Sequence, residues 1–366
     1  MMDLAGIEKR KQRHIRLSLE KDVEADIGTG FEDVRLIHRA LPEINLEDVS
    51  TETTLFGKRL MAPLIVSAIT GGTDYAKEIN STLATVAEEL GIGVGVGSQR
   101  IALEDPSKEH TFTVVRDRAP STLVMGNIGC PQLSLGWGPK EARLCVEMIE
   151  ADALAIHMNP LQEAVQMDGE TNYEGVLSSV EAIAKELHVP VVMKETGCGI
   201  AYEEAVKLEE VGVAGLELSG TGGTSWAAVE HHIAREEEKR DQEALGEALW
   251  NWGIPTAISL VETRKSTSLK IIASGGLRTG LEMAKAIVLG ADGVGIARPF
   301  LEKAVEGEDA LREHVENMLL EFRTVMFLVG AKNIGELKRV PAIILGRTAE
   351  WLRLRGFDPK DYSIRE

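Results

Sequence analysis

The chain has 366 residues, of which 44% are hydrophobic and 27% charged, so it is long enough to bury a large core. Its 58 acidic and 40 basic residues give a formal net charge of −18, which argues against general affinity for nucleic acid or an anionic membrane surface. Three cysteines without metal-ligand spacing, no signal peptide and no apolar run near the roughly 20 residues of a membrane span predict a cytoplasmic protein.

The first 60 residues contain a basic segment and a predicted hairpin. Residues 9–16 read K-R-K-Q-R-H-I-R, a basic concentration in an otherwise acidic chain. From the residues alone two interpretations stay open: an arm that folds over a binding site, or a solvated helix, which is the commoner outcome for a run of charge. Residues 51–61 are typical of a hairpin that turns near Gly57-Lys58 and closes the floor of a barrel.

From Leu60 onward, short apolar stretches alternate with amphipathic ones, as repeated strand–helix units do. The predicted strands are 64–68, 92–96, 122–125, 153–157, 191–194, 215–218, 270–274 and 293–296. Each ends in a small or polar cluster, such as G-N-I-G at 126–129. Because barrel enzymes carry their functional residues at the rim where parallel strands end, this pattern predicts an enzyme. The fold class is therefore α/β, a (β/α)8 TIM barrel.

Apolar residues at three- and four-residue intervals predict the helices between these strands. They are 75–90, 140–150, 173–187, 202–211 and 280–289, with terminal helices at 309–330 and 333–355. The charged stretch 226–252 is longer than one helix needs and is expected to protrude. We expect one domain, with an arm and floor hairpin at 1–60, the barrel at 61–305 and C-terminal helices at 306–366.

The cluster H-M-N-P-L-Q-E at 157–163 brings an imidazole, two amides and a carboxylate to the predicted rim. His157 and Asn159 alternate onto one side, and Gln162 and Glu163 follow a turn set by proline. Oxygen ligands of this kind suit Mg²⁺, with Glu163 as the metal ligand. The alternative is a capped loop of solvated polar residues. Arg100, in G-S-Q-R, offers a cation at the same rim.

Two further clusters carry charge at predicted strand ends. Lys194 ends an apolar strand, where a cation is costly unless an anion faces it; it either stabilises negative charge on a cofactor or pairs with Glu195 or another carboxylate. The loop S-G-T-G-G-T-S-W at 219–226 can approach a flat ligand closely, and Thr224 can cap a helix or bond a phosphate. Glu230 is either a general base or its partner, or a surface glutamate.

The stretch 270–300 predicts a phosphate site. Gly275 and Gly276 are expected to open a helix N-terminus, where bare N–H groups and the helix dipole favour an anion. The turn Ala297-Arg298-Pro299 follows one strand later. Adjacent turns after the last two strands of a TIM barrel commonly share the phosphate of a cofactor.

Together these motifs closely resemble type 2 isopentenyl diphosphate isomerase, the flavin-dependent form of that enzyme, over nearly the whole chain. The resemblance is carried by R-K-Q-R-H, S-A-I-T-G-G, G-V-G-S-Q-R, G-N-I-G-C-P-Q-L, H-M-N-P-L-Q-E, K-E-T-G-C-G, S-G-T-G-G-T-S-W and S-G-G-L-R-T-G. Ile69 replaces the usual methionine, and Arg298 replaces a commonly apolar residue.

The resemblance implies FMN at the barrel mouth and a five-carbon alkenyl diphosphate as substrate. The implied FMN contacts are Ser67, Ala68, Ile69, Thr70, Ser98, Asn127, Lys194, Ser219, Thr224, Gly275, Gly276, Leu277, Arg278, Ala297 and Arg298. The implied substrate contacts are Arg10, Lys11, His14, Ser98, Gln99, Arg100, His157, Asn159 and Gln162. Mg²⁺ on Glu163 would neutralise the diphosphate.

The implied reaction is a 1,3-allylic proton shift between isopentenyl and dimethylallyl diphosphates in isoprenoid biosynthesis. Reduced FMN would act as acid and base, with NADPH needed only to reduce it. The implied catalytic residues are Gln162, which positions the alkene, Lys194, which balances charge on the ring, and Glu230 and His157, which tune the surrounding hydrogen bonds. A homo-oligomer, a tetramer or an octamer, is expected.

Two rival functions remain. An FMN-dependent 2-hydroxy-acid oxidase explains the phosphate turns, but that chemistry needs a histidine base late in the barrel, and none stands there. A non-catalytic flavin-binding barrel would leave the cluster at 157–163 without a role.

Overall fold

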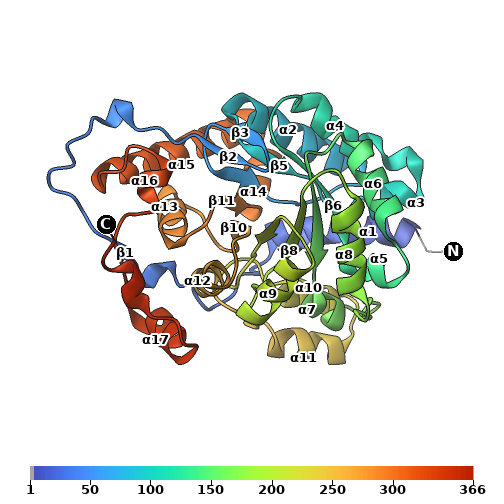
Figure 1. The fold of residues 1–366 in the computed structure, drawn as a ribbon. Helices are drawn as coiled ribbons and strands as arrows, with labels where there is room; N and C mark the ends of the chain where they lie inside the picture. The colour runs from blue at the N-terminus through green and yellow to red at the C-terminus, as the bar shows by residue number, and fades with distance from the viewer. Residues whose placement is uncertain (1–3, 366) are drawn as a thin grey trace.

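A closed barrel of eight parallel strands forms the centre of the computed structural model, which describes residues 4–365 (Figure 1). The strands are β4 (Leu64–Val66), β5 (Gly93–Gly95), β6 (Val124–Gly129), β7 (Ala153–Met158), β8 (Val191–Glu195), β9 (Gly215–Glu217), β10 (Lys270–Ser274) and β11 (Gly293–Ile296). Each pairs with the next in chain order, and β11 pairs with β4. The predicted (β/α)8 barrel and its eight strands are confirmed.

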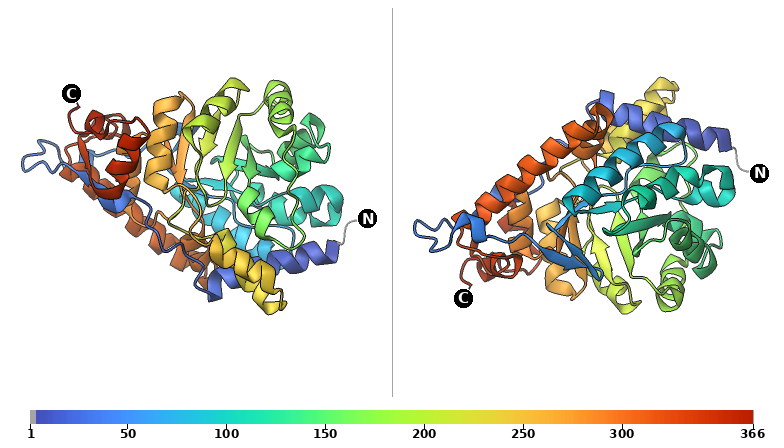
Figure 2. Two further views of the ribbon diagram at one scale, coloured as in Figure 1. Left: turned by 90° about the horizontal axis from the view of Figure 1, so that it is seen from below. Right: turned by 90° about the horizontal axis from the view of Figure 1, so that it is seen from above.

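Helices follow every strand and surround the barrel (Figures 1 and 2). They are α2 (Asp74–Leu90), α3 (Arg100–Glu104), α4 (His110–Arg118), α5 (Cys130–Ser134), α6 (Pro139–Met148), α7 (Pro160–Val165), α8 (Val176–Glu186), α9 (Tyr202–Glu210), α10 (Trp226–Glu236), α11 (Arg240–Ala248), α12 (Thr256–Ser266), α13 (Gly280–Leu289) and α14 (Arg298–Glu306). Short 3-10 helices are η1 (Phe31–Asp33), η2 (Leu46–Asp48), η3 (Pro106–Lys108) and η4 (Pro359–Tyr362). The five helices predicted between the strands are confirmed to within three residues at each end.

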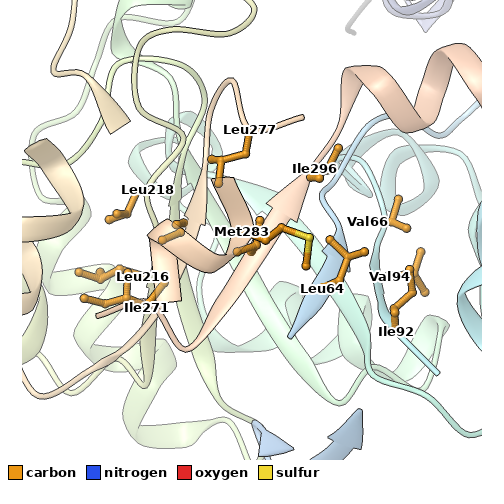
Figure 3. Packing of buried hydrophobic residues seen from close by; sticks show 14 of the residues in the cluster. Leu64, Val66, Ile92, Val94, Leu216, Leu218, Ile271, Leu277, Met283 and Ile296 are labelled. Carbon is orange, nitrogen blue, oxygen red and sulfur yellow. The ribbon is translucent and has the colours of Figure 1, made fainter. Parts of the chain in front are cut away.

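The main core lies between the strands and these helices. Figure 3 shows Met283 of α13 beside Leu64, among apolar side chains of the barrel strands. Met283 and Leu64 are both fully buried. The helices therefore bury one apolar face against the barrel wall, as expected for amphipathic helices.

Inside the barrel, an apolar layer lies below a polar layer. Ile65, Met125, Ala155, Val192 and Ile272 belong to one buried cluster. Side chains on a strand return to the same face every second residue. The next inward position on each of these strands is polar, and these residues are Ser67, Asn127, His157, Lys194 and Ser274. The apolar layer thus supports a polar floor for whatever binds at the mouth.

The predicted floor hairpin is confirmed as β2 (Thr53–Leu55) and β3 (Lys58–Leu60). Its turn is one residue earlier than expected, at Phe56 and Gly57, both with positive φ. Leu55 and Leu60 join the apolar layer inside the barrel. The hairpin therefore closes the barrel at the end opposite to the polar layer.

The basic segment forms α1 (Leu4–Glu20), which lies beside α10 (Figure 2). Leu17 is fully buried in a small cluster with Val23, Val229 and Ile233. Arg16 donates to Glu236 on α10 at 2.7 Å, and Arg13 pairs with Glu237. The arm is therefore packed against the barrel.

Three expectations need correction. Residues 126–129, expected as a turn, form the last four residues of β6, and all six residues of that strand are buried between its neighbours. The stretch 226–252 is two helices, and only α11 extends outward, since most of α10 is buried (Figure 1).

The third correction concerns 333–355, expected as one helix after α15 (Glu308–Leu328). It forms α16 (Ile334–Leu337), β12 (Ala342–Ile344) and α17 (Gly346–Leu354). Pro341 lacks a backbone donor and Gly346 has φ 57°, so a continuous helix is interrupted. β12 pairs antiparallel with β1 (Val34–Leu36). Between residues 4 and 365, no helix has the length and apolar character needed to cross a membrane.

Candidate active site

A cavity of about 280 Å³ opens at the carboxyl ends of the barrel strands and is partly covered by α1. This volume is close to the lower end of the range for small-molecule pockets, roughly 300 to 1,000 Å³. Its walls come from the ends of all eight strands, and the arm adds Lys11, His14, Ile15 and Ser18. The cavity therefore lies where the sequence pattern predicts a site.

All the residues expected to contact a cofactor line this cavity. Of the expected substrate residues, Lys11, His14, Ser98, His157 and Gln162 line it as well. Those that do not are Arg10, Gln99, Arg100 and Asn159, and the expected metal ligand Glu163 lies outside the lining too. Gln99 is fully buried and donates to the Cys145 carbonyl at 2.9 Å, so its side chain is directed into the barrel wall.

His157 projects from β7 into the cavity, where its Nδ1 lies 2.8 Å from Asn127 Oδ1 on β6. Since the amide oxygen accepts, Nδ1 carries the proton and Nε2 keeps a lone pair. Burial, with Lys194 and Lys11 nearby, lowers the pKa of His157 to about 4. The ring is therefore neutral at pH 7 and acts as a hydrogen-bonding group. Gly129 allows its position, since a Cβ there would lie 2.7 Å from Nε2.

Lys194 is the penultimate residue of β8, and its side chain is buried below the cavity. Nζ donates to the Glu195 carbonyl at 2.9 Å and to Ser219 Oγ at 3.0 Å, and it lies 3.3 Å from Glu217 Oε1. Lys194 lines the cavity and also pairs with a carboxylate, so its two interpretations are compatible with each other. That carboxylate is Glu217, not the adjacent Glu195.

Ser219, in the turn that follows β9, has φ 39°, a left-handed conformation that is uncommon outside glycine. Its N–H donates to Ser274 Oγ at 2.9 Å, and its hydroxyl lies 3.1 Å from the same oxygen. Strained backbone of this kind persists where surrounding contacts hold it, often at functional sites. Here it keeps the Ser219 hydroxyl within reach of Lys194.

Glu230 on α10 contacts both Gln162 on α7 and His14 on the arm. Gln162 Nε2 lies 3.5 Å from Glu230 Oε1, and His14 Nε2 lies 3.0 Å from the same oxygen. Glu230 is only 3% exposed, so the interpretation as a surface glutamate is wrong. Asn159 Nδ2 donates to Gln162 Oε1 at 3.2 Å. Both ends of the Gln162 amide are therefore held.

A second polar cluster lies beside the cavity and includes Glu170, which sequence reasoning missed. Arg100 donates to both oxygens of Glu170, at 3.0 and 3.1 Å. The Glu170 N–H donates to Glu163 Oε2 at 2.8 Å, and Asn159 donates to Glu163 Oε1 at 2.8 Å. Within residues 4–365 no three acidic, histidine or cysteine side chains converge as a metal site.

The end of the cavity where a phosphate is expected differs from the sequence prediction in one respect. α13 begins at Gly280, as predicted, so Gly275 and Gly276 lie before it and do not open its N-terminus, which Thr279 and Glu282 cap. The backbone N–H groups of Gly280 and Leu281 also donate to Glu321, at 3.0 and 3.2 Å. The N-terminus of α13 is therefore already occupied by protein carboxylates and is not an anion site.

Three other features make this end suitable for an anion. Gly275 and Gly276 form a turn with positive φ, and a Cβ on Gly275 would lie 2.1 Å from the Gly220 carbonyl. α14 begins directly after β11 with no side-chain cap at Ala297. Arg278 and Arg298 line the cavity, where both pair with Glu24, at 2.6 and 3.1 Å. Backbone N–H groups, a helix start and two guanidinium groups suit a phosphate.

The fit to FMN can be judged from these same features. A glycine cradle that approaches closely enough to exclude side chains suits a flat ring with a phosphate tail. A Cβ on Gly223 would lie 2.5 Å from the Gly276 N, so the two turns touch through backbone alone. The residues present therefore fit FMN.

Comparison with known proteins gives two kinds of similarity. Residues 139–343 match the model of the FMN-dependent dehydrogenase family. The chain is 47% identical to the isopentenyl-diphosphate delta-isomerase of Methanothermobacter thermautotrophicus, over 98% of this chain and 99% of that one. It is 46% identical to proteins of the same name from Methanosarcina acetivorans, covering 97% of both chains, and Pyrococcus horikoshii, covering 94% of both.

Solved structures of mandelate oxidase show the same fold. One with 3,3,3-trifluoro-2,2-dihydroxypropanoic acid has a TM-score of 0.62 at 20% identity, over 94% of this chain and 99% of that one. Another with (S)-2-phenylpropionate has a TM-score of 0.60 at 20% identity, with the same coverage. At this identity the similarity concerns the fold alone.

Proposed function

The chain belongs to the FMN-dependent dehydrogenase family and to the type 2 isopentenyl-diphosphate delta-isomerases, and from this premise we propose how its cavity isomerises an alkenyl diphosphate. The observation that carries the proposal is the position of α1. It brings Lys11 and His14 to the same cavity that the strand ends line, so one space offers a flavin cradle and a cationic cover.

FMN would be held along the strand ends, with its phosphate between the turn at Gly275 and Gly276 and the start of α14. Arg278 and Arg298 would add positive charge there. They would give up their ion pairs with Glu24 to contact the phosphate. Thr70, Asn127 and Lys194 would line the ring. When bound and reduced, FMN supplies an electron-rich ring and an exchangeable proton to the double bond of the substrate.

The diphosphate would lie under the arm. Lys11 donates to the carbonyls of Gly71 and Ser98, at 2.8 and 3.2 Å, which holds its ammonium beside the cavity. Arg100 and Arg10 lie outside the cavity lining. They would attract the diphosphate by their positive charge from a distance, or contact it after the loop at Glu170 moves. Because the chain has a formal net charge of −18, it needs such local cations to bind an anion.

Mg²⁺ would be shared between the protein and the diphosphate. Glu163 supplies carboxylate oxygens of the kind that Mg²⁺ prefers, and its neighbour Glu170 lies within one hydrogen bond of it. Because the described residues form no three-ligand site, the ion would be completed by substrate oxygens and water. The metal and the diphosphate would therefore bind together.

Gln162 and Glu230 would serve the proton transfer. The Gln162 amide is held at both ends, so it can orient an alkene, while an amide is too weak an acid to protonate one. Glu230 is buried behind it and is the ionisable group that Gln162 contacts. His157 is neutral and offers a hydrogen bond without adding positive charge that would oppose a developing carbocation.

The remaining parts of the proposal concern the setting of the enzyme. The residues that line the cavity lie between Lys11 and Leu301 in the sequence, which supports one functional unit built from the arm and the barrel. We propose that NADPH reduces the flavin, that the protein acts in the cytoplasm in isoprenoid biosynthesis, and that it forms a homo-oligomer.

Proton NMR of isopentenyl diphosphate in D₂O tests the function. With enzyme, FMN, Mg²⁺ and dithionite, we expect deuterium to appear in dimethylallyl diphosphate. Omitting FMN should abolish the reaction, and omitting Mg²⁺ should weaken it. Isomerisation that persists in flavin-free protein would contradict the proposal, and hydrogen peroxide released from a 2-hydroxy acid would favour the oxidase function instead.

A further inference from the structure

Glu217, to which the proposed function gives no role, lies directly below the cavity. It is the last residue of β9, is 3% exposed and does not line the cavity. Its Oε1 accepts from Ser67 Oγ at 2.6 Å and lies 3.3 Å from Lys194 Nζ. Both partners line the cavity, so this carboxylate holds two side chains that would touch FMN.

Strand register explains this arrangement. Lys194 and Glu217 are Cα partners in the β8–β9 pair, so their side chains leave the sheet on the same, inner face. Ser67 follows β4 and reaches Glu217 across the barrel interior. Gly295 on β11 leaves room for this contact, since a Cβ there would lie 2.3 Å from Ser67 Oγ and 3.2 Å from Glu217 Oε1.

Glu217 decides which groups its partners present to the cavity. A hydroxyl has one proton, and Ser67 donates it to Glu217, so Ser67 offers only lone pairs to a ligand. An ammonium has three donors, and Lys194 directs them to Glu195, Ser219 and Glu217. Lys194 therefore acts on the cavity mainly through its charge.

We propose that Glu217 is a positioning residue that keeps Lys194 and Ser67 below the flavin and offsets the charge that Lys194 imposes on the ring. The proposal rests on FMN binding in this cavity, as set out above. Reduction adds negative charge to the ring, and buried charges interact strongly because little water screens them. An uncompensated Lys194 would therefore favour the reduced, anionic flavin.

The test is the midpoint potential of bound FMN in the purified holoprotein, compared between wild type and E217Q. Glutamine keeps the size and can still accept from Ser67, while the charge is lost. We expect the potential of E217Q to become more positive and its reduced spectrum to shift toward the anionic form. The FMN dissociation constant should change less than tenfold.

E262Q is the matched control. Glu262 on α12 is about 1% exposed, and its carboxylate bonds Arg355 and Trp351, neither of which lines the cavity. E262Q should lower the melting temperature and leave the flavin potential at the wild-type value. The comparison separates loss of a buried charge in general from loss of this one.

A wild-type potential in FMN-loaded E217Q would overturn the proposal. If E217Q does not bind FMN, E217D is measured, because it draws the charge back by one methylene and should shift the potential in the same direction by less. Folded E217D with a wild-type potential would also overturn it, and so would folded variants that both fail to bind FMN, since Glu217 would then hold the cofactor. Failure of wild type to bind FMN would instead refute the proposed function.

Discussion

The two halves of the cavity are built in different ways. The half formed by the turns after β9, β10 and β11 is shaped by backbone, with Gly220, Gly223, Gly275 and Gly276 packed against one another. The half under α1 and α7 is built from side chains that come from distant parts of the chain, such as His14 and Glu230. One half is part of the barrel, and the other is assembled on it.

This difference has an energetic consequence. A backbone turn inside a barrel cannot yield without moving the strands that carry it, because interiors are close-packed. A cover held by side chains can yield locally. Changes in the backbone half should therefore lower both stability and FMN affinity, while changes in the side-chain half should lower turnover or substrate affinity and leave the fold intact.

G275A should have the largest effect. Gly275 has φ 100°, and a Cβ there would lie 2.1 Å from the Gly220 carbonyl, which is backbone and cannot move alone. We expect a loss of about 3 to 5 kcal/mol in the free energy of unfolding and of about 100-fold or more in FMN affinity. Fluorescence titration with FMN and chemical denaturation measure the two quantities.

G57A is the control for G275A. Gly57 also has a positive φ, 82°, but no atom lies within 4 Å of its added Cβ. Strain alone should cost about 1 to 2 kcal/mol and leave FMN affinity unchanged. Equal effects of the two substitutions would show that close approach at Gly275 does not shape the cofactor half.

E230Q should affect turnover and leave the fold intact. Glu230 contacts both Gln162 and His14, and glutamine preserves its size while removing its capacity to ionise. We expect kcat to fall by about 100-fold, with the melting temperature and FMN affinity near their wild-type values. E236Q, at a more exposed position of the same helix, should retain most of kcat; if E230Q does so as well, Glu230 takes no part in the proton transfer.

His157 lies at the border, since it is carried by a barrel strand and faces the substrate half. Its pKa in the folded protein is about 4, below the unfolded value of about 6.5, so the unfolded state binds the proton first. The free energy of unfolding should therefore fall as pH drops from about 6.5 to 4, by about 3 kcal/mol at most from this group.

H157N should remove this part of the pH dependence. Denaturation curves at several pH values should show wild type losing stability relative to H157N as pH falls, while H188N, at an exposed position, follows wild type. Parallel profiles for wild type and H157N would mean that His157 is not held neutral by the barrel and belongs to the side-chain half.

The backbone half could be predicted from the sequence more fully than the side-chain half. Glycine-rich turns after apolar strands are local patterns, so the sequence alone assigns Gly275 and Gly276 to a phosphate site, and both line the cavity. The start of α13 at Gly280 was predicted correctly, but the expectation that Gly275 and Gly276 open its N-terminus was wrong, because Thr279 caps it. Local chemistry decides that detail, and the T-G-L-E sequence carries the signal for it.

The partners of the charged residues could not be predicted in the same way. Glu170 lies in a charged stretch, and only the fold shows that it faces Arg100, 70 positions earlier. Glu217 interrupts the apolar strand 215–218, a signal that could have marked it, but its contact with Ser67 spans 150 positions. Such pairs depend on strand register and barrel closure, which a single sequence does not specify.

The smallest effect is expected where the cover is fastened by surface charge. Arg16 and Arg13 pair with Glu236 and Glu237 in partly exposed positions, and such pairs contribute roughly 0.2 to 1 kcal/mol each. R13A/R16A should therefore raise the KM for isopentenyl diphosphate by about 3- to 10-fold, with kcat and FMN affinity unchanged, because Leu17 still docks the arm. The difference from wild type should shrink at high salt, which screens the pairs.

K185A, which breaks an exposed pair with Glu181 on α8, should leave KM unchanged. A double variant that loses FMN as readily as substrate would show that the arm belongs to the cofactor half, and the division of the cavity would fail.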